Sequence, residues 1–272
     1  MAEALVSDLL VERRGAILQV TFNRPDKKNA VTPEIVVRLA ETWKRLRDDA
    51  ELRVAILTGV GDAFCAGADL GRLIPLLSKA RLPEDEFDHA LVADRSIFQT
   101  AFLRRFEIWK PIIAAVNGFA LAGGMELLQA TDIRLATPEA TFGLSEPKRG
   151  IIPGGGSTVR LARQIPYVVA MRILLTGRPI SAEKALAAGF VNEIVQREKL
   201  LDTAYAIAEE IAENAPLAVQ KIKESVVRSS GVPFDDAFAI EDEVVKTVLR
   251  SEDAKEGPRA FIEKRKPIFK GR

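Results

Sequence analysis

Histidine and cysteine are almost absent from this chain of 272 residues, which has one of each. A single histidine, His89, cannot build a multi-histidine metal centre, and we expect it to lie on a helix surface rather than in a Ser/His/Asp triad. Cys65 has no cysteine partner for an internal disulfide and no nearby histidine to activate it, so we expect a small buried side chain. Acid–base chemistry must therefore rest on carboxylates, lysines or tyrosines.

Strong net charge, long apolar runs and a secretory signal are also missing. The 38 acidic residues nearly cancel the 39 basic ones, so the overall charge favours neither nucleic acid nor an anionic membrane surface as a partner. No apolar run is long enough for a membrane-spanning helix. The first residues carry acids early and lack a basic segment followed by an apolar one, as a signal peptide requires. The predicted location is the reducing cytoplasm, without a membrane association.

Buried strands and amphipathic helices alternate over the first two thirds of the chain. Apolar runs closed by glycine or proline predict strands, and a Thr32-Pro33 start and a Ser181 cap ended by Gly189 predict helices. The expected strands lie at 15–25, 53–59, 110–118, 132–136 and 140–143. Segment 71–109 is expected to be a mobile loop that leads into a helix from about Glu84.

After about residue 157, glycine-closed strands give way to helical patterns with short breaks, and the mixed core is expected to continue to about residue 195. Only amphipathic stretches follow, and we expect helices at roughly 198–213, 216–229, 233–250 and 253–265. The sequence therefore predicts a mixed α/β core over residues 1–195 and an all-helical region over residues 196–272.

Three glycine-rich segments follow or separate the apolar runs, at 61–70, 117–128 and 142–166. Glycine allows close backbone approach, and a turn that ends a strand and opens a helix leaves peptide N–H groups without partners. Two such turns side by side would form an oxyanion hole, whereas a single one is also typical of a tight structural turn. The third segment lacks the Lys-Ser/Thr of a nucleotide P-loop, and no dinucleotide fingerprint is present.

Two acids, Glu126 and Glu146, fall inside these segments. Burial raises the pKa of a carboxyl group, and a second carboxylate nearby raises one of the two further. A shared pocket could therefore hold one acid and one base near neutral pH, and such a pair could add or remove water. The alternative is that Glu146 forms a surface ion pair with Lys148 or Arg149.

At these segments the sequence resembles the enoyl-CoA hydratase/isomerase (crotonase) superfamily. The matching stretches cover the chain nearly end to end; they are "NRPDKKNAVTPE" (23–34), "AFCAGADL" (63–70), "PIIAAVNGFALAGGMELLQATDIRLAT" (111–137), "FGLSEPKRGIIPGGG" (142–156), "LLTGRPISAEKALAAGFVNEIV" (174–195) and "FIEKRKPIFKGR" (261–272). The resemblance implies an α/β fold, a spiral of ββα units followed by a C-terminal helical region that assembles trimers, commonly paired as hexamers.

The resemblance also implies an acyl-CoA thioester as substrate, with no separate cofactor and no metal. The thioester oxygen would accept hydrogen bonds from the peptide N–H groups of Ala68 and Gly123. Glu126 and Glu146 would flank the substrate as catalytic residues. The positions that match family contacts to coenzyme A are Lys27, Lys28, Ala30, Ala66 and Asp69, with Phe261 and Lys264 reaching the CoA of a neighbouring subunit.

The implied activity is hydration of the 2,3 double bond of a trans-2-enoyl-CoA in fatty-acid or related acyl-CoA metabolism. Two alternatives remain from the sequence. One is another crotonase activity, such as Δ3-Δ2 isomerisation or dehydration of a specialised hydroxyacyl-CoA. The other is a non-catalytic member that binds acyl-CoA or RNA, although near-neutral charge and the lack of a basic, aromatic run argue against RNA.

Overall fold

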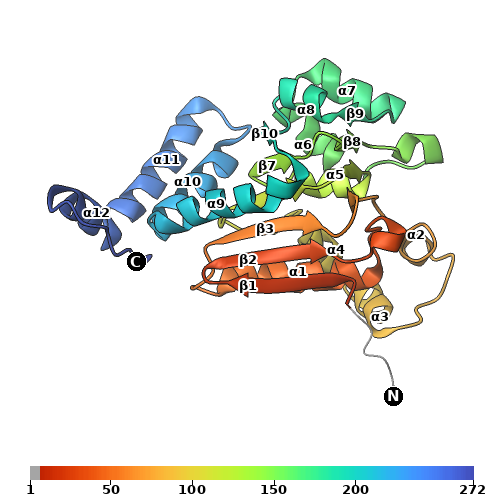
Figure 1. Ribbon diagram of the computed structural model, residues 1–272, viewed down its shortest axis with the longest axis horizontal. Coiled ribbons are helices and arrows are strands. Elements are labelled where there is room, and N and C mark those ends of the chain that lie inside the picture. Colours follow the sequence, from red (N-terminus) through yellow and green to blue (C-terminus); the bar gives the residue numbers. More distant parts are fainter. Residues whose placement is uncertain (1–6) are drawn as a thin grey trace.

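The apolar runs form a six-stranded sheet in the computed structural model, which describes residues 7–272 (Figure 1). The strand order is β1-β2-β3-β5-β7-β10, with β1 and β2 antiparallel and the remaining neighbours parallel. Their bounds are β1 (Leu9–Arg14), β2 (Ile17–Phe22), β3 (Val54–Gly59), β5 (Ile112–Val116), β7 (Ile133–Ala136) and β10 (Glu193–Ile194). The strands predicted at 15–25, 53–59, 110–118 and 132–136 are confirmed, and β1 and β10 are additions that the sequence did not indicate.

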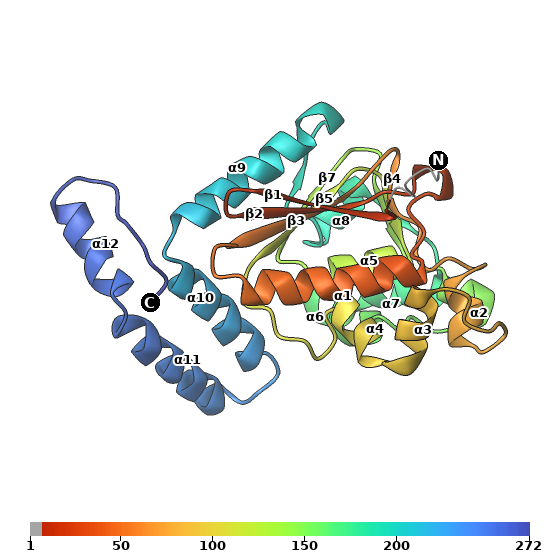
Figure 2. The same ribbon diagram turned by 90° about the horizontal axis from the view of Figure 1, so that it is seen from below.

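Both faces of this sheet are covered by helices, which explains why its central strands are continuously apolar. In β3, Ala55 and Leu57 pack into the core shared with α1 (Pro33–Asp48), whereas Val54 and Ile56 face α9 (Leu200–Glu213). Figure 2 shows the sheet between these two helices. The predicted cap of α1 is present, because Thr32 Oγ1 accepts a hydrogen bond from the amide of Ile35 at 3.3 Å.

A second, four-stranded sheet has the order β4-β6-β8-β9. Its strands are β4 (Ala63–Cys65), β6 (Phe119–Leu121), β8 (Thr141–Gly143) and β9 (Ile180–Ser181). The chain passes three times from the first sheet to the second and then into a helix, as β3-β4-α2, β5-β6-α5 and β7-β8-α6. This repetition confirms the predicted spiral of ββα units, and the parallel pairing of β4, β6 and β8 brings their carboxyl ends to one edge.

Segment 71–109 forms three short helices, α2 (Leu73–Leu77), α3 (Glu86–Ala93) and α4 (Ser96–Ala101). The helix expected from about Glu84 corresponds to α3, whose N-cap Asp85 accepts a hydrogen bond from the amide of Asp88 at 2.8 Å. The sequence did not predict α2 and α4, because helices of five and six residues are too short to show a periodic pattern. The other elements of the core are α5 (Gly123–Leu128), α6 (Ser157–Gln164), α7 (Tyr167–Thr176), α8 (Ala182–Ala187), and the 3-10 helices η1 (Pro25–Lys27), η2 (Glu146–Arg149) and η3 (Arg197–Lys199).

The residues after 195 form helices, and Figure 1 shows the last three extending away from the sheets. These three are α10 (Pro216–Ser229), α11 (Phe234–Leu249) and α12 (Asp253–Ile262). Because α9 packs on the first sheet through Leu200, Ala204 and Ala208, we propose that it belongs to the core, and that the separate helical region begins at α10. None of the helices within residues 7–272 is long and apolar enough to cross a membrane.

Candidate active site

A cavity of about 730 Å³ opens at the edge where β4, β6 and β8 end. Most of the site residues expected from the sequence line it; these are Lys27, Ala30, Ala66, Ala68, Asp69, Gly123, Glu126 and Glu146. They come from segments more than a hundred residues apart in the chain. The parallel order of β4, β6 and β8 brings the segments that follow these three strands to one edge of the second sheet. Lys27 and Ala30 follow β2 of the first sheet, and the adjoining bridge between Val31 and Ala68 holds their segment beside the others.

The turns around Ala68 and Gly123 present two peptide N–H groups side by side. Val31 forms a parallel bridge with Ala68. The Val31 amide donates to the carbonyl of Gly67, and the Val31 carbonyl accepts from the amide of Asp69. This pairing leaves the N–H of Ala68 directed away from the bridge. Gly123 is the first residue of α5, where a helical amide has no intrahelical acceptor.

Gly67 holds these two turns in contact. Its φ of +96° is a conformation that favours glycine, and a Cβ added there would lie 2.6 Å from Cβ of Ala122 and 3.2 Å from the amide nitrogen of Gly123. Ala122 itself has a φ of +48°, so backbone strain is concentrated immediately before the Gly123 donor. Two amides in adjoining turns are the kind of donors that an oxyanion hole requires.

Glu126 is buried on α5, with only 4% of its surface exposed. Its Oε1 accepts hydrogen bonds from the amides of Gly155 at 2.8 Å and Ser157 at 3.1 Å. Burial raises the pKa of this carboxyl group, and the hydrogen bonds from Ser157 and Gly155 partly oppose that rise. The third glycine-rich segment therefore binds a carboxylate of the protein itself, a role that the sequence did not reveal.

Glu146 is the first residue of η2 and has 6% of its surface exposed. Burial, with a smaller contribution from the charge of Glu126, raises its pKa to about 7. Among residues 7–272, no group forms a hydrogen bond with its Oε2. The alternative of a surface ion pair is wrong for the described part of the chain, where Lys148 and Arg149 are exposed and neither forms an ion pair with this buried carboxyl group.

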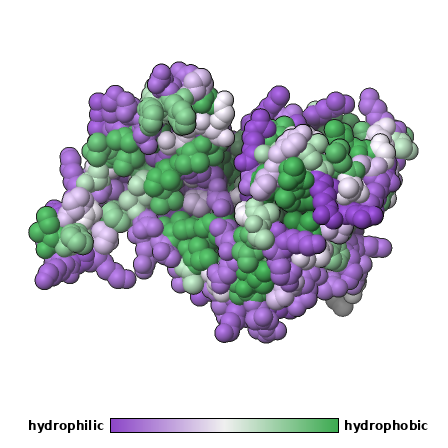
Figure 3. Space-filling view, turned by 90° about the horizontal axis from the view of Figure 1, so that it is seen from above, coloured by the Kyte–Doolittle hydropathy of each residue, from purple (hydrophilic) through white to green (hydrophobic). Residues whose placement is uncertain are grey.

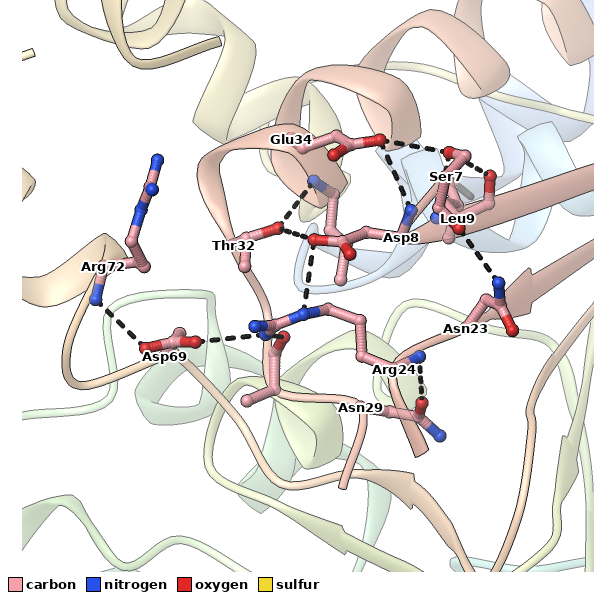
Figure 4. A network of polar contacts seen from close by, with 12 residues as sticks. Ser7, Asp8, Leu9, Asn23, Arg24, Asn29, Thr32, Glu34, Asp69 and Arg72 are labelled. Carbon is pink, nitrogen blue, oxygen red and sulfur yellow. Dashed lines mark hydrogen bonds and ion pairs between the residues drawn. The ribbon is translucent and has the colours of Figure 1, made fainter. Parts of the chain in front are cut away.

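Arg24 contacts Ala30 and Asp69, two residues that line the cavity, in the polar network drawn in Figure 4. Its Nη1 donates to the carbonyl of Ala30 at 2.7 Å and lies 3.0 Å from Asp69 Oδ2, while its Nε lies 3.3 Å from Asp8 Oδ2. Asp69 in turn accepts hydrogen bonds from the amides of Gly71 and Arg72. This network holds segments 28–31 and 66–72 in register; it joins residues far apart in sequence, and no local pattern indicated it.

Three of the expected CoA contacts do not line the cavity of the single chain. The Nζ of Lys28 lies 2.8 Å from Asp62 in an exposed ion pair. Phe261 is 86% exposed on α12, which Figure 1 shows extending away from the sheets, and neither Phe261 nor Lys264 lines the cavity. The contact of the last two positions with a CoA of a neighbouring subunit, which the family resemblance implies, therefore stays a prediction.

The remaining candidate residues lie where the sequence analysis expected them. His89 is exposed on α3. Cys65 is buried, and burial raises the pKa of its thiol to about 12, which suits a structural side chain rather than a nucleophile. Across the described residues, no cluster of three or more His, Cys, Asp or Glu side chains is placed to hold a metal ion.

Comparison with known proteins identifies the family. Residues 12–272 match the family model for enoyl-CoA hydratase/isomerase. The chain is 44% identical to the enoyl-CoA hydratase EchA19 of Mycobacterium tuberculosis over 97% of both chains. It is 40% identical to the (E)-benzylidenesuccinyl-CoA hydratase of Thauera aromatica over 96% of this chain and 98% of that protein.

Solved structures agree with these sequence matches. An enoyl-CoA hydratase from Mycobacterium tuberculosis superposes with a TM-score of 0.87 at 40% identity, covering 98% of this chain and 100% of that one. The enoyl-CoA hydratase EchA1 from Mycobacterium marinum gives a TM-score of 0.86 at 41% identity, with the same coverage. The chain belongs to the enoyl-CoA hydratase/isomerase (crotonase) family.

Proposed function

We propose that this protein is an enoyl-CoA hydratase that reversibly adds water across the 2,3 double bond of a trans-2-enoyl-CoA. One observation carries the proposal. Two buried carboxyl groups, both with raised pKa, line the same cavity as two peptide N–H groups from adjoining turns. Hydration needs a base for water, an acid for the α-carbon and donors for the thioester oxygen, and this cavity offers all three.

In the proposed reaction, the amides of Ala68 and Gly123 bind the thioester oxygen and polarise the conjugated double bond. Ionised Glu126 removes a proton from the water molecule that attacks C3. The electron pair of the double bond moves toward the thioester, and the resulting enolate oxygen is stabilised by the two amides. Protonated Glu146 then delivers its proton to C2, which completes the addition without a further cofactor.

The proposed function can be tested with the purified protein and crotonyl-CoA. Loss of the absorbance of the conjugated thioester would report hydration, and chromatography of the product would separate hydration from migration of the double bond. Absence of turnover with short, medium and long trans-2-enoyl-CoA thioesters would contradict the proposal. An isomerase would instead convert a 3-enoyl-CoA without forming a hydroxyacyl product.

The pH dependence of kcat/KM is expected to be bell-shaped. The base form of Glu126 is lost as the pH falls through a pKa that lies above its ordinary value of 4.5. The acid form of Glu146 is lost as the pH rises through about 7. For the hydration direction, kcat/KM should therefore fall about tenfold per pH unit on each side of a maximum below pH 7. A profile that keeps rising above pH 8 would contradict the acid role of Glu146.

Replacement of Gly67 by alanine is expected to lower kcat/KM for crotonyl-CoA by about two to three orders of magnitude, the effect of losing one oxyanion donor. The new Cβ would meet Cβ of Ala122 at 2.6 Å and push the Gly123 amide out of place. Gly71→Ala is the matched control in the same loop, because its Cβ meets nothing closer than 3.5 Å. Equal activity of the two variants would show that the close approach at Gly67 does not position the Gly123 amide for catalysis.

The C-terminal helices carry many exposed apolar side chains, visible as green patches on this part of the surface in Figure 3. These side chains are Ile222, Val226 and Val227 of α10, Phe234, Phe238, Val245 and Leu249 of α11, and Phe261 and Ile262 of α12. Apolar side chains exposed in such number on neighbouring helices are typical of a subunit interface. We therefore propose a homotrimer or homohexamer, in which Phe261 and Lys264 contact the CoA of a neighbour. A cytoplasmic location also remains a prediction.

A further inference from the structure

Two buried polar side chains behind Glu126 have no part in the reaction described so far. Ser157, the first residue of α6, is fully buried, and Gln129, which follows the last residue of α5, is 2% exposed. The Nε2 of Gln129 donates a hydrogen bond to Ser157 Oγ at 2.8 Å and to the carbonyl of Met125 at 3.2 Å. Buried polar groups that pair in this way fix the orientation of their neighbours.

The direction of these hydrogen bonds is set by Met125. Its carbonyl can only accept, so the side chain of Gln129 must present its NH2 group on this side. Ser157 Oγ consequently accepts from Gln129, and its own hydrogen is free to point to the other side. The amide of the same serine donates to Glu126 Oε1 at 3.1 Å, and the Ser157 side chain lowers the pKa of this carboxyl group.

We propose that Ser157 and Gln129 are positioning residues that keep Glu126 ionised and correctly oriented as the base for hydration. The inference rests on the proposed function for its role. Its geometry rests on the hydrogen bond from Gln129 to Ser157 Oγ and on that from the Ser157 amide to Glu126, and the donation from the Ser157 hydroxyl to Glu126 is part of the proposal. The hydroxyl and the two amides of Gly155 and Ser157 together replace the hydration that the buried carboxylate loses. Gln129 acts through the hydroxyl, because it occupies the acceptor side of Ser157 Oγ and leaves only the donor side for Glu126.

The charged groups around Glu126 would not account for a change in its titration when Ser157 or Gln129 is substituted. Glu146 from η2 lines the same cavity and disfavours a second negative charge. Arg160 from α6 is the cation that interacts with Glu126, but its guanidinium also donates to the carbonyls of Phe102 and Leu103. Arg104, which repels Arg160, donates to the carbonyl of Gly154. Substitution of Ser157 or Gln129 leaves Glu146, Arg160 and Arg104 in place. A change in the titration of Glu126 would therefore result from the loss or reorientation of the Ser157 hydroxyl.

The test compares Ser157→Ala and Gln129→Leu with the wild type in the pH dependence of kcat/KM for crotonyl-CoA. Both variants should move the acid limb to higher pH by about one pKa unit, which lowers kcat/KM about tenfold on that limb and much less near the maximum. Thr158→Ala is the matched control, because it removes the neighbouring exposed hydroxyl on the same helix turn and should leave the profile unchanged. A uniform loss at every pH, or an unshifted limb, would overturn the inference.

A second measurement separates this inference from the proposed function. The titration of Glu126 can be followed by infrared difference spectroscopy, with Glu126→Gln used to identify its carboxyl band. If the wild type does not hydrate any enoyl-CoA, the proposed function fails, but the inference still predicts a higher midpoint for this band in Ser157→Ala. Should that variant not fold, Gln129→Leu tests the same positioning role, because it removes the hydrogen bond to Ser157 Oγ. An unchanged midpoint in a folded variant would refute the assignment.

Discussion

Glu146→Gln is expected to lower kcat for hydration by about two to four orders of magnitude, the usual contribution of a general acid or base. The amide keeps the size of the side chain but cannot deliver a proton to C2 of the substrate. The Oε2 of Glu146 has no hydrogen-bond partner within residues 7–272, so the substitution breaks no internal contact at that atom. Steady-state turnover of crotonyl-CoA measures the effect, and full activity would remove Glu146 from the mechanism.

The same substitution is expected to stabilise the protein above pH 7. The pKa of Glu146 rises from its ordinary value of 4.5 to about 7 on folding, so the unfolded chain loses this proton at lower pH than the folded protein does. The free energy of unfolding of the wild type therefore falls as the pH rises from about 4.5 to about 7. Glutamine has no proton to lose and avoids this cost, which is at most about 3 kcal/mol.

Thermal unfolding at pH 5 and at pH 8 checks this expectation. The difference in Tm between Glu146→Gln and the wild type should be small at the lower pH and clearly positive at the higher one. A variant that is inactive yet more stable at pH 8 cannot owe its inactivity to misfolding. Equal Tm differences at both pH values would show that Glu146 does not titrate with a raised pKa.

Local patterns predicted the elements whose signals lie within a few consecutive residues. The apolar runs around β3 and β5 are continuous because helices cover both faces of the sheet, and the Thr32-Pro33 start marks the cap of α1. β1 was missed because its second half, Glu12 to Arg14, is exposed and charged. α2 and α4 were missed because they depend on packing around the cavity rather than on a periodic pattern of their own.

In the candidate site, the sequence likewise indicated the two acids but not the groups that contact them. Glu126 and Glu146 stand out in the sequence because each is an acid in an otherwise small or apolar segment after a strand. Their partners could not be found in this way. The hydrogen bond from the Gly155 amide to Glu126 joins residues 29 positions apart in the sequence, and that from Gln129 to Ser157 joins residues 28 positions apart. Only the stacking of α5 against the start of α6 brings these groups together.

The glycines at 154–156 gain a specific explanation from this packing. A Cβ on Gly155 would lie 2.8 Å from Glu126 Oε2 and 2.6 Å from the ring of Phe102. The Phe102 ring in turn lies near Gly123, 3.4 Å from the position that a Cβ would occupy there. One aromatic ring thus lies between Gly123, the proposed oxyanion donor, and Gly155, whose amide binds the proposed base Glu126. The small size of Gly155 allows this arrangement.

Glu126→Gln is expected to cause a loss of kcat comparable to that of Glu146→Gln, about two to four orders of magnitude, because the amide cannot take a proton from water. The fold should tolerate it, since the glutamine Oε1 can still accept from the amides of Gly155 and Ser157. Affinity for a CoA product, measured by calorimetry, should change little. Glu210→Gln, on the exposed side of α9, is the control that removes a carboxylate without touching the cavity.

The double variant Glu126→Gln/Ser157→Ala connects this prediction to the positioning role of Ser157. Groups that act as a unit lose their effects together, so removal of the hydroxyl should cost almost nothing further once the base is absent. Ser157→Ala should therefore shift the acid limb when Glu126 is intact and produce no pH-dependent loss when it is combined with Glu126→Gln. A full additional loss in the double variant would mean that Ser157 affects turnover by a route other than Glu126.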